Sequence, residues 1–190
     1  MRYNPPLGME KRVGVLVGTK GRGSNLAALA QAGIPISVVV GADGSAPVRE
    51  VVRYLGLRWE EICHGEDYSL RLRSALEGCD LVCLAGYLRL LPSEVTDRFP
   101  VINIHPSLLP AHGGKGMYGL HVHRAVLSAG ETESGCTVHR VGSVYDEGEI
   151  VLQARCPVLP GDTPETLAAR VLELEHRVYP QAARQVLFGD

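Results

Sequence analysis

An amide and an imidazole stand one residue apart where an apolar segment of the chain ends. The segment covers residues 99–104, Asn103 and His105 lie at its end, and two prolines, Pro106 and Pro110, follow closely. In an extended strand residues i and i+2 point to the same face, and prolines restrict the backbone of the loop that follows. An amide N–H can polarise a carbonyl group while an imidazole moves a proton. The spacing therefore predicts a catalytic pair suited to acyl or formyl transfer, although a lone histidine at a strand end is usually only a satisfied polar residue.

A carboxylate partner for this imidazole is available at Asp146, within the polar segment 142–149. A carboxylate beside an imidazole orients the ring and raises its pKa. The catalytic interpretation requires Asp146 to fold back against His105. The alternative is an acidic, solvated turn.

A glycine-containing turn at residues 21–26 (Gly-Arg-Gly-Ser-Asn-Leu) has the composition of an anion site. Glycines let the backbone approach a ligand, and free N–H groups at a helix start bind anions. Ser24 and Asn25 add donors, so a phosphate ester is the natural ligand. The segment is neither a dinucleotide fingerprint nor a P-loop, because no Lys-Ser/Thr ending follows. The alternative is a plain turn with a helix cap.

The loop at residues 86–91 follows an apolar run and contains one cation, Arg89. In open parallel sheets ligands bind beyond the carboxyl ends of the strands. An apolar loop at that place fits a flat aromatic heterocycle. Core packing with one solvated arginine explains the same residues.

Further histidines raise the question of a metal site, namely His112, His121, His123 and His139. His121 and His123 are two residues apart, a spacing that a helix does not align, and no paired cysteines or Glu-x-x-His pattern accompany them. We expect no metal, and we assign these histidines to the substrate pocket or the surface.

The elements that position these residues follow from apolar runs in the first half of the chain. Strands are expected at residues 12–18, 36–42, 59–63, 81–85 and 101–104, with helices at 24–32, 46–55, 68–77 and 92–98 between them. Ser24 or Asn25 would cap the first helix. Nearly continuous apolar strands are typical of parallel sheets covered on both faces. The sequence predicts an α/β fold with a doubly wound, mostly parallel, Rossmann-like sheet flanked by helices.

The pattern changes after His105. A helix is expected at residues 120–129, and strands at 135–141 and 150–157 are expected to pair antiparallel at the far edge of the sheet. A long amphipathic helix is expected within residues 163–186, with Asp162 or Thr163 as its cap and Pro164 in its first turn.

Composition sets limits on function. The chain has 190 residues and a net charge of −2, so nothing calls for nucleic acid or an acidic membrane as partner. Five scattered cysteines without a C-x-x-C pair indicate buried, reduced thiols in a cytoplasmic protein. No apolar run approaches the ~20 residues of a membrane span. We expect residues 1–11 to be a short mobile lead-in, because they lack an apolar signal core.

Six short motifs, in this order along the chain, resemble the phosphoribosylglycinamide formyltransferase family, a folate-dependent group of purine synthesis. They are Gly-x-Gly-Ser-Asn-Leu at 21–26, Ala-Gly-Tyr-Leu-Arg-Leu-Leu at 85–91, Asn-Ile-His-Pro-Ser-Leu-Leu-Pro at 103–110, Cys-Thr-Val-His at 136–139, Asp-Glu-Gly at 146–148 and Glu-His-Arg-Val-Tyr-Pro at 175–180. The third motif marks the wider formyltransferase superfamily. The first and the last narrow the resemblance to this family.

The resemblance implies transfer of the formyl group of 10-formyltetrahydrofolate to glycinamide ribonucleotide, by a monomer or homodimer without a metal. The catalytic residues would be Asn103, His105 and Asp146. The substrate would be held by Gly23, Ser24, Asn25 and Glu175. The folate site would contain Leu88, Arg89, Leu90, Leu91, Asn103, Gly142, Val144 and Asp146.

These assignments give an expected mechanism and division of the chain. The substrate amine attacks the formyl carbon, Asn103 and a protonated His105 stabilise the oxyanion, and Asp146 keeps His105 cationic. Residues 12–190 would form one domain, with a nucleotide-phosphate half at about 12–100 and a folate and catalytic half at about 101–190. The glycine-rich segment 111–119 is longer than in the shortest relatives and is expected to act as a mobile lid.

Other functions remain possible on the sequence alone. Methionyl-tRNA formyltransferase resembles the chain at residues 103–110 but carries a further basic domain, and formyltetrahydrofolate hydrolase carries an N-terminal regulatory domain; we expect neither here. A nucleotide-binding α/β module without catalysis is the alternative from a different class, and it leaves Asn103, His105 and Asp146 unexplained.

Overall fold

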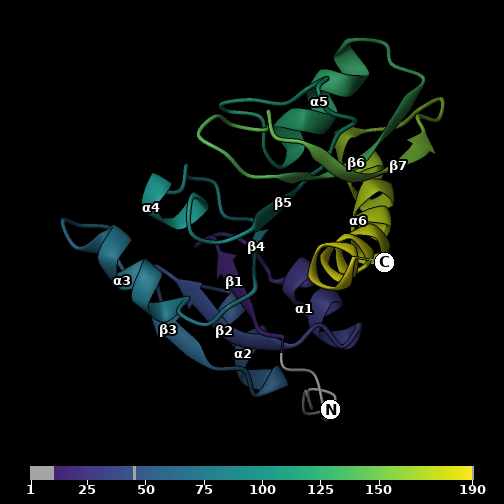
Figure 1. Cartoon of the computed structure of the whole chain (residues 1–190). Coiled ribbons are helices and arrows are strands. Elements are labelled where there is room, and N and C mark those ends of the chain that lie inside the picture. Colours follow the sequence, from purple (N-terminus) through teal and green to yellow (C-terminus); the bar gives the residue numbers. More distant parts are fainter. Residues whose placement is uncertain (1–10, 45, 190) are drawn as a thin grey trace.

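The computed structural model describes residues 11–44 and 46–189, so the predicted lead-in at 1–11 lies outside the described residues except for Lys11. The strands form one seven-stranded sheet with the order β3-β2-β1-β4-β5-β6-β7 (Figure 1). They are β1 (Val13–Val17), β2 (Ile36–Gly41), β3 (Trp59–Glu61), β4 (Leu81–Ala85), β5 (Val101–His105), β6 (Glu133–Arg140) and β7 (Ile150–Pro157).

The direction of the strands confirms the predicted fold class. The pairs among β1 to β5 are parallel, whereas β5–β6 and β6–β7 are antiparallel. All residues of β1 and β4 are buried, as expected for central strands covered on both faces. β6 begins two residues before its predicted start, because its ladder with β7 continues through the Ser134–Cys156 pair to Glu133.

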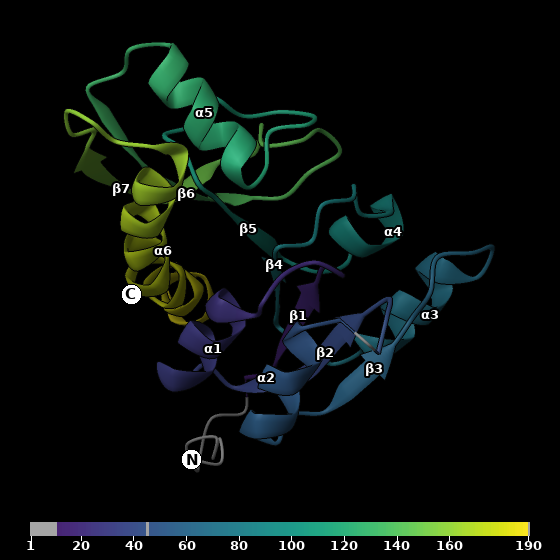
Figure 2. The ribbon, with the colours of Figure 1, turned by 180° about the vertical axis from the view of Figure 1, so that it is seen from behind.

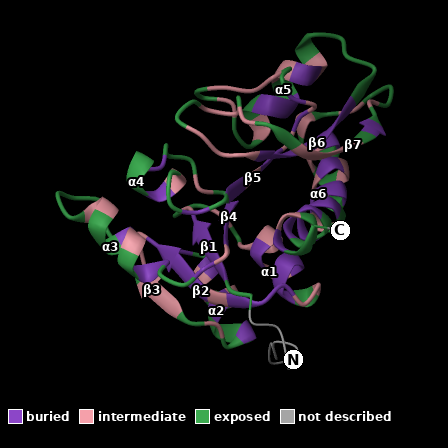
Figure 3. Cartoon of the chain, viewed as in Figure 1, coloured by how far each residue is buried: buried purple, intermediate pink, exposed green. Residues whose placement is uncertain are grey.

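Helices cover both faces of the sheet (Figure 2). They are α1 (Ser24–Gln31), α2 (Val48–Leu55), α3 (Tyr68–Ala75), α4 (Ser93–Thr96), α5 (Leu120–Ser128) and α6 (Pro164–Phe188). One core unites the inner sides of α1, α2, α5 and α6 with one face of the sheet, and a second core lies between the other face and α3 and α4. β1 serves both, because Val13 and Val15 face the first core and Leu16 faces the second. Buried residues accordingly concentrate in the strands and the inner sides of the helices (Figure 3).

The start of α1 differs from the prediction. Ser24 is the first helical residue, Gly23 occupies the cap position with a φ of 79°, and no side chain caps the helix. The left-handed backbone of Gly23 turns the chain into the helix one residue earlier than a Ser24 cap requires and two residues earlier than an Asn25 cap requires. The Asn25 amide is used elsewhere, against Glu175.

The long helix α6 begins as predicted. Thr163 Oγ1 accepts a hydrogen bond from the Thr166 N–H, the Thr163 N–H donates to Thr166 Oγ1, and Pro164 is the first helical residue. Further along, the buried Tyr179 hydroxyl contacts the carbonyl oxygens of Leu84, at 2.8 Å, and Ile102, at 3.2 Å. This side chain therefore fixes α6 against β4 and β5.

Two sequence expectations concern compartment and membrane. All five cysteines are unpaired, and four are buried as expected, but Cys63 is exposed because it follows the short edge strand β3. Among the described residues, no helix has the length and apolar character needed to cross a membrane.

Candidate active site

A cavity of about 680 Å³ lies at the carboxyl ends of the central parallel strands. Its walls come from α1, from the loops after β4 and β5, from the segment after β6 and from α6. β1 and β4 are neighbours in the sheet. The chain continues from β1 to β2 on one side of this pair and from β4 to β5 on the other side. Such a switch point is where open α/β sheets bind ligands.

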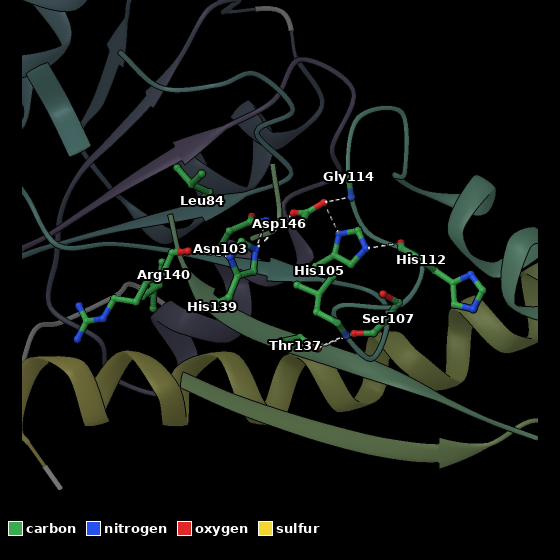
Figure 4. A network of polar contacts seen from close by, with 12 residues as sticks. Leu84, Asn103, His105, Ser107, His112, Gly114, Thr137, His139, Arg140 and Asp146 are labelled. Atoms are coloured by element: carbon green, nitrogen blue, oxygen red, sulfur yellow. Dashed lines mark hydrogen bonds and ion pairs between the residues drawn. The ribbon is translucent and has the colours of Figure 1, made fainter. Parts of the chain in front are cut away.

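Asp146 folds back against His105 across this cavity (Figure 4). The distance between Asp146 Oδ2 and His105 Nδ1 is 3.5 Å, and the Gly114 N–H donates to the same oxygen at 2.9 Å. The backbone of Asp146 is left-handed, with a φ of 58°. Few non-glycine residues adopt this conformation, with Asp among the more frequent, and strained backbones of this kind cluster at functional sites. The contact required by the catalytic interpretation is therefore present.

His139, which the sequence assigned only to the substrate pocket or the surface, completes the cluster. Its Nε2 lies 3.4 Å from Asp146 Oδ1 and 3.3 Å from Asn103 Nδ2, while its Nδ1 donates to the Arg140 carbonyl at 2.8 Å. The feature that could have identified His139 is the antiparallel pairing of β5 with β6, which places His139 directly opposite Asn103. The amide of Asn103 carries two hydrogens, so one can face His139 while the other faces a ligand.

The protonation of His105 differs from the expectation. Its Nε2 lies 2.9 Å from the His112 carbonyl oxygen, which can only accept, so Nε2 carries a proton. Burial lowers the pKa of His105, and the Asp146 carboxylate, which raises it, does not compensate. This lowered pKa runs against the cationic His105 that the expected mechanism uses. The neutral ring presents an unprotonated Nδ1 to Asp146.

Asp146 itself is ionised. Burial raises the pKa of a carboxyl group, but here the contacts with His139 and with the Gly114 N–H outweigh burial and lower the pKa of Asp146. A proton arriving at Nδ1 of His105 would therefore form an imidazolium paired with a carboxylate. The cluster can accept a proton, whereas a cationic ring could only donate one.

A second polar pair lies in the same cavity. Asn25 Nδ2 donates to Glu175 Oε2 at 2.7 Å, and both residues line the cavity. Burial raises the pKa of Glu175 to about 7, against a smaller lowering effect of the Asn25 hydrogen bond. The Asn25 Oδ1 atom is buried and has no hydrogen-bond partner among the described residues. An amide oxygen and a carboxyl group are thus held ready for a polar ligand.

The cavity collects most, but not all, of the predicted site residues. Among those lining it are Asn25, Leu88, Arg89, Leu90, Asn103, His105, Val144, Asp146 and Glu175. Gly23, Ser24, Leu91 and Gly142 are not among its lining residues. Leu91 is buried in the second core instead, against the face of the sheet covered by α3 and α4.

The remaining histidines divide between pocket and surface. His123 and His139 line the cavity, and His121 is exposed. His112 is half-buried, with its Nε2 3.2 Å from Glu131. Over residues 11–44 and 46–189, no three His, Cys, Asp or Glu side chains are grouped as a metal site requires.

Comparison with known proteins identifies the family. The formyl transferase family pattern matches residues 11–183. The chain belongs to the formyl transferase family. Its fold resembles glycinamide ribonucleotide transformylase 1 from Symbiobacterium toebii, with a TM-score of 0.83 and 40% identity over 94% of this chain and 88% of the other. It also resembles phosphoribosylglycinamide formyltransferase from Brucella melitensis, with a TM-score of 0.81 and 39% identity over 95% and 98% of the two chains.

Sequence relatives within the family are also named phosphoribosylglycinamide formyltransferase. The chloroplastic phosphoribosylglycinamide formyltransferase of Arabidopsis thaliana is 54% identical over 104 residues, which are 54% of this chain. The alignments cover 36% of that protein and 33% of the Vigna unguiculata enzyme, so the match spans about a third of these plant proteins. The predicted family resemblance is confirmed.

Proposed function

We propose that this formyl transferase moves the formyl group of 10-formyltetrahydrofolate to the amino group of glycinamide ribonucleotide. The products are formylglycinamide ribonucleotide and tetrahydrofolate, in de novo purine biosynthesis. The observation that carries the proposal is the cluster of Asn103, His105 and Asp146 inside the cavity, with Asp146 Oδ2 3.5 Å from His105 Nδ1. The names of the relatives supply the identity of the substrate.

The cluster supports a mechanism in which His105 starts neutral. The substrate amine attacks the formyl carbon, and Asn103 donates an N–H to the oxygen that becomes negative. The proton lost by the attacking nitrogen passes to Nδ1 of His105, where the Asp146 carboxylate stabilises the imidazolium. The proton then moves to the leaving folate nitrogen. Donors preorganised in this way typically contribute about 10²–10³ in rate.

The start of α1 and Glu175 are proposed to bind the nucleotide. The first N–H groups of a helix have no partner within it and attract anions. The N–H groups of Gly23, Ser24 and Asn25 would hold the 5′-phosphate, with the hydroxyl of Ser24. Glu175 would contact the ribose or the glycinamide part, beside Asn25.

The loop after β4 and the segment after β6 are proposed to bind the folate. Leu88 and Leu90 are exposed hydrophobic residues on the cavity wall, and Val144, also exposed, lines the cavity from the segment after β6. Exposed apolar side chains that line a cavity are typical of a site for a flat heterocycle. Arg89, Leu91 and Gly142 complete the proposed folate site with Asn103 and Asp146. No metal takes part in the proposed chemistry.

The compartment, the subunit number and the division of the chain are also part of the proposal. We place the enzyme in the cytoplasm as a monomer or homodimer, and its unpaired cysteines are typical of a reducing compartment. The plant relatives named above are chloroplastic. The division into a nucleotide-phosphate half and a folate half remains a prediction.

One assay separates the proposed function from its alternatives. Purified protein is mixed with 10-formyl-5,8-dideazafolate, and the absorbance of the deformylated product is followed with and without glycinamide ribonucleotide. Formyl transfer requires a signal that depends on the nucleotide and disappears in Asn103→Ala. A signal without the nucleotide would indicate a hydrolase. No signal with both, from protein that still binds the nucleotide, would indicate a binding module.

A further inference from the structure

The backbone of His112 faces the active site while its side chain turns away from it. Its carbonyl oxygen lies 2.9 Å from Nε2 of His105. Its ring points in the opposite direction (Figure 4), and its Nε2 lies 3.2 Å from Glu131 Oε1, just after α5. Neither His112 nor Glu131 is among the residues lining the cavity. One residue thus connects the reacting histidine to a carboxylate outside the site.

The His112 carbonyl decides which nitrogen of His105 is protonated. The tautomer of a neutral imidazole is set by the hydrogen bond that its other nitrogen makes. A carbonyl on Nε2 keeps the proton there, so Nδ1 stays free to face Asp146. If the carbonyl moved away, the proton could shift to Nδ1 and donate to Asp146, and the ring would no longer accept a proton on that side.

The position of this carbonyl needs support from elsewhere. The φ of His112 is 56°, in the left-handed region that residues with a Cβ avoid. The preceding residue is anchored, because Ser107 Oγ donates to the Ala111 carbonyl at 2.7 Å. The following residues are Gly113 and Gly114, which restrict the backbone little. Of the described residues, Glu131 is the ion-pair partner of the His112 side chain.

We propose that the hydrogen-bonded pair of His112 and Glu131 is a positioning device for the catalytic histidine. It holds a strained backbone in the orientation that keeps the His112 carbonyl on Nε2 of His105. His112 and Glu131 are then positioning residues, which act through His105 without touching the substrate. This inference rests on the proposed formyl transfer, because that reaction needs Nδ1 as proton acceptor.

The test combines kinetics with the nitrogen-15 NMR signals of His105, which distinguish its tautomers. Glu131→Ala and His112→Ala are expected to lower kcat about five-fold, with KM little changed. One half-exposed pair of this kind can change the fraction of molecules with the correct backbone orientation by about that factor. Both variants should convert His105 to a mixture of tautomers. Glu131→Gln, which can still accept a hydrogen bond, should restore most of both readouts. His112→Gly should lower kcat less than His112→Ala does, because glycine adopts the left-handed backbone without strain.

A matched control is Glu133→Ala, which removes an exposed ion pair with Arg155 on the neighbouring strands. It should change neither kcat nor the His105 signals. Unchanged kcat and an unchanged tautomer in Glu131→Ala and His112→Ala would overturn the proposal, even if both variants were less stable. An equal effect of Glu133→Ala would overturn it too. The NMR measurement needs no substrate, so it still tests the positioning role if the wild-type protein transfers no formyl group.

Discussion

At the scale of single residues, the site lowers the pKa values of two neighbouring groups. The pKa of Asp146 is lowered, while burial lowers the pKa of His105. A carboxylate beside a neutral ring is thus the resting state near pH 7, and the charge on the ring appears only when a proton arrives. Nearby groups with shifted pKa values of this kind are typical of acid–base catalysts.

Removal of the cluster residues should affect chemistry more than folding. Asn103→Ala, His105→Ala and Asp146→Ala are each expected to lower kcat by about 10²–10³, because each removes a group that interacts with the developing charge or its counter-charge. Steady-state kinetics with both substrates provides the measurement, and the melting temperature is the control for folding. Full activity of Asp146→Ala would remove that carboxylate from the mechanism.

Glu175 makes stability depend on pH. Burial raises its pKa from 4.5 to about 7, so between these values the native protein keeps a proton that the unfolded chain has lost. Stability then falls as pH rises through this window. Glu175→Gln lacks this titration. The free energy of unfolding of the variant, relative to that of the wild type, should therefore increase by about 3 kcal/mol from about pH 4.5 to about pH 7.

Denaturant unfolding at several pH values measures this difference. Glu165, an acidic residue in the first turn of the same helix, supplies the control, and Glu165→Gln should follow the wild-type pH dependence. Parallel curves for wild type and Glu175→Gln would mean that Glu175 is ionised in the native protein.

The sequence predicted the residue types of the site better than their charge states. Asn103 and His105 could be found because strand spacing brings them to one face. The direction of the pKa shift of His105 could not be predicted, because it depends on how deeply the ring is buried. The His112 contact could not be found either, because its donor group meets a backbone carbonyl in an irregular loop.

At the scale of elements, the start of α1 depends on one glycine. Gly23 has a φ of 79°, and a Cβ placed there would lie 2.7 Å from Val48 Cγ2 and 3.2 Å from Val51 Cγ2, on α2. Gly21, two residues earlier, has open space around its Cβ position. The two glycines of one turn therefore have different structural requirements.

Alanine at these two glycines should separate their roles. Gly23→Ala combines backbone strain with a clash against α2, so unfolding should become easier by about 1–3 kcal/mol and KM for the nucleotide should rise. Gly21→Ala should change the free energy of unfolding little. Thermal unfolding and steady-state kinetics on the pair measure both effects, and equal results for the two variants would contradict the assignment.

The contact of α6 with the sheet makes a second prediction at this scale. The Tyr179 hydroxyl contacts the carbonyl oxygens of Leu84 in β4 and Ile102 in β5, and the side chain is fully buried. Tyr179→Phe should lower the free energy of unfolding by about 1–3 kcal/mol, because it leaves buried carbonyl groups without this donor. Chemical denaturation measures the loss. A variant as stable as the wild type would show that those carbonyl groups find other donors.

The elements were predicted well where hydrophobic patterns are strong. β4 has its predicted bounds, and α6 begins at its predicted cap, because both depend on local residue types. The α1 cap was wrong, because the left-handed backbone of Gly23 starts the helix at Ser24, and a glycine has no side chain whose role a capping pattern could reveal.

At the scale of the whole molecule, the cavity exists only when distant parts of the chain meet. Asn25, Asn103, Asp146 and Glu175 come from four separate regions, and one sheet with α6 across it brings them together. The predicted class of fold indicated the carboxyl edge of the sheet as the site. It did not indicate that the segment after β6 would reach back across this edge, since a loop between strands has no hydrophobic pattern to fix its direction.

Ligands that join these regions should stabilise the folded chain. Glycinamide ribonucleotide at about a hundred times its Kd should add about 2.7 kcal/mol, which corresponds to a rise in melting temperature of about 5–10 °C. The same compound without its phosphate should give a smaller rise, and so should the natural ligand with Asn25→Ala. Differential scanning fluorimetry measures these shifts. Equal shifts with and without the phosphate would place that group outside the α1 start.

The proton that Glu175 retains in the empty cavity also has a consequence for ligand capture. A cationic group that settles beside this carboxyl favours its ionised form, so the retained proton must leave for the medium as the complex forms. The heat measured by titration calorimetry should then vary with the ionisation enthalpy of the buffer. The apparent affinity should strengthen as the solution becomes more alkaline, until the carboxyl has already lost its proton before the ligand arrives.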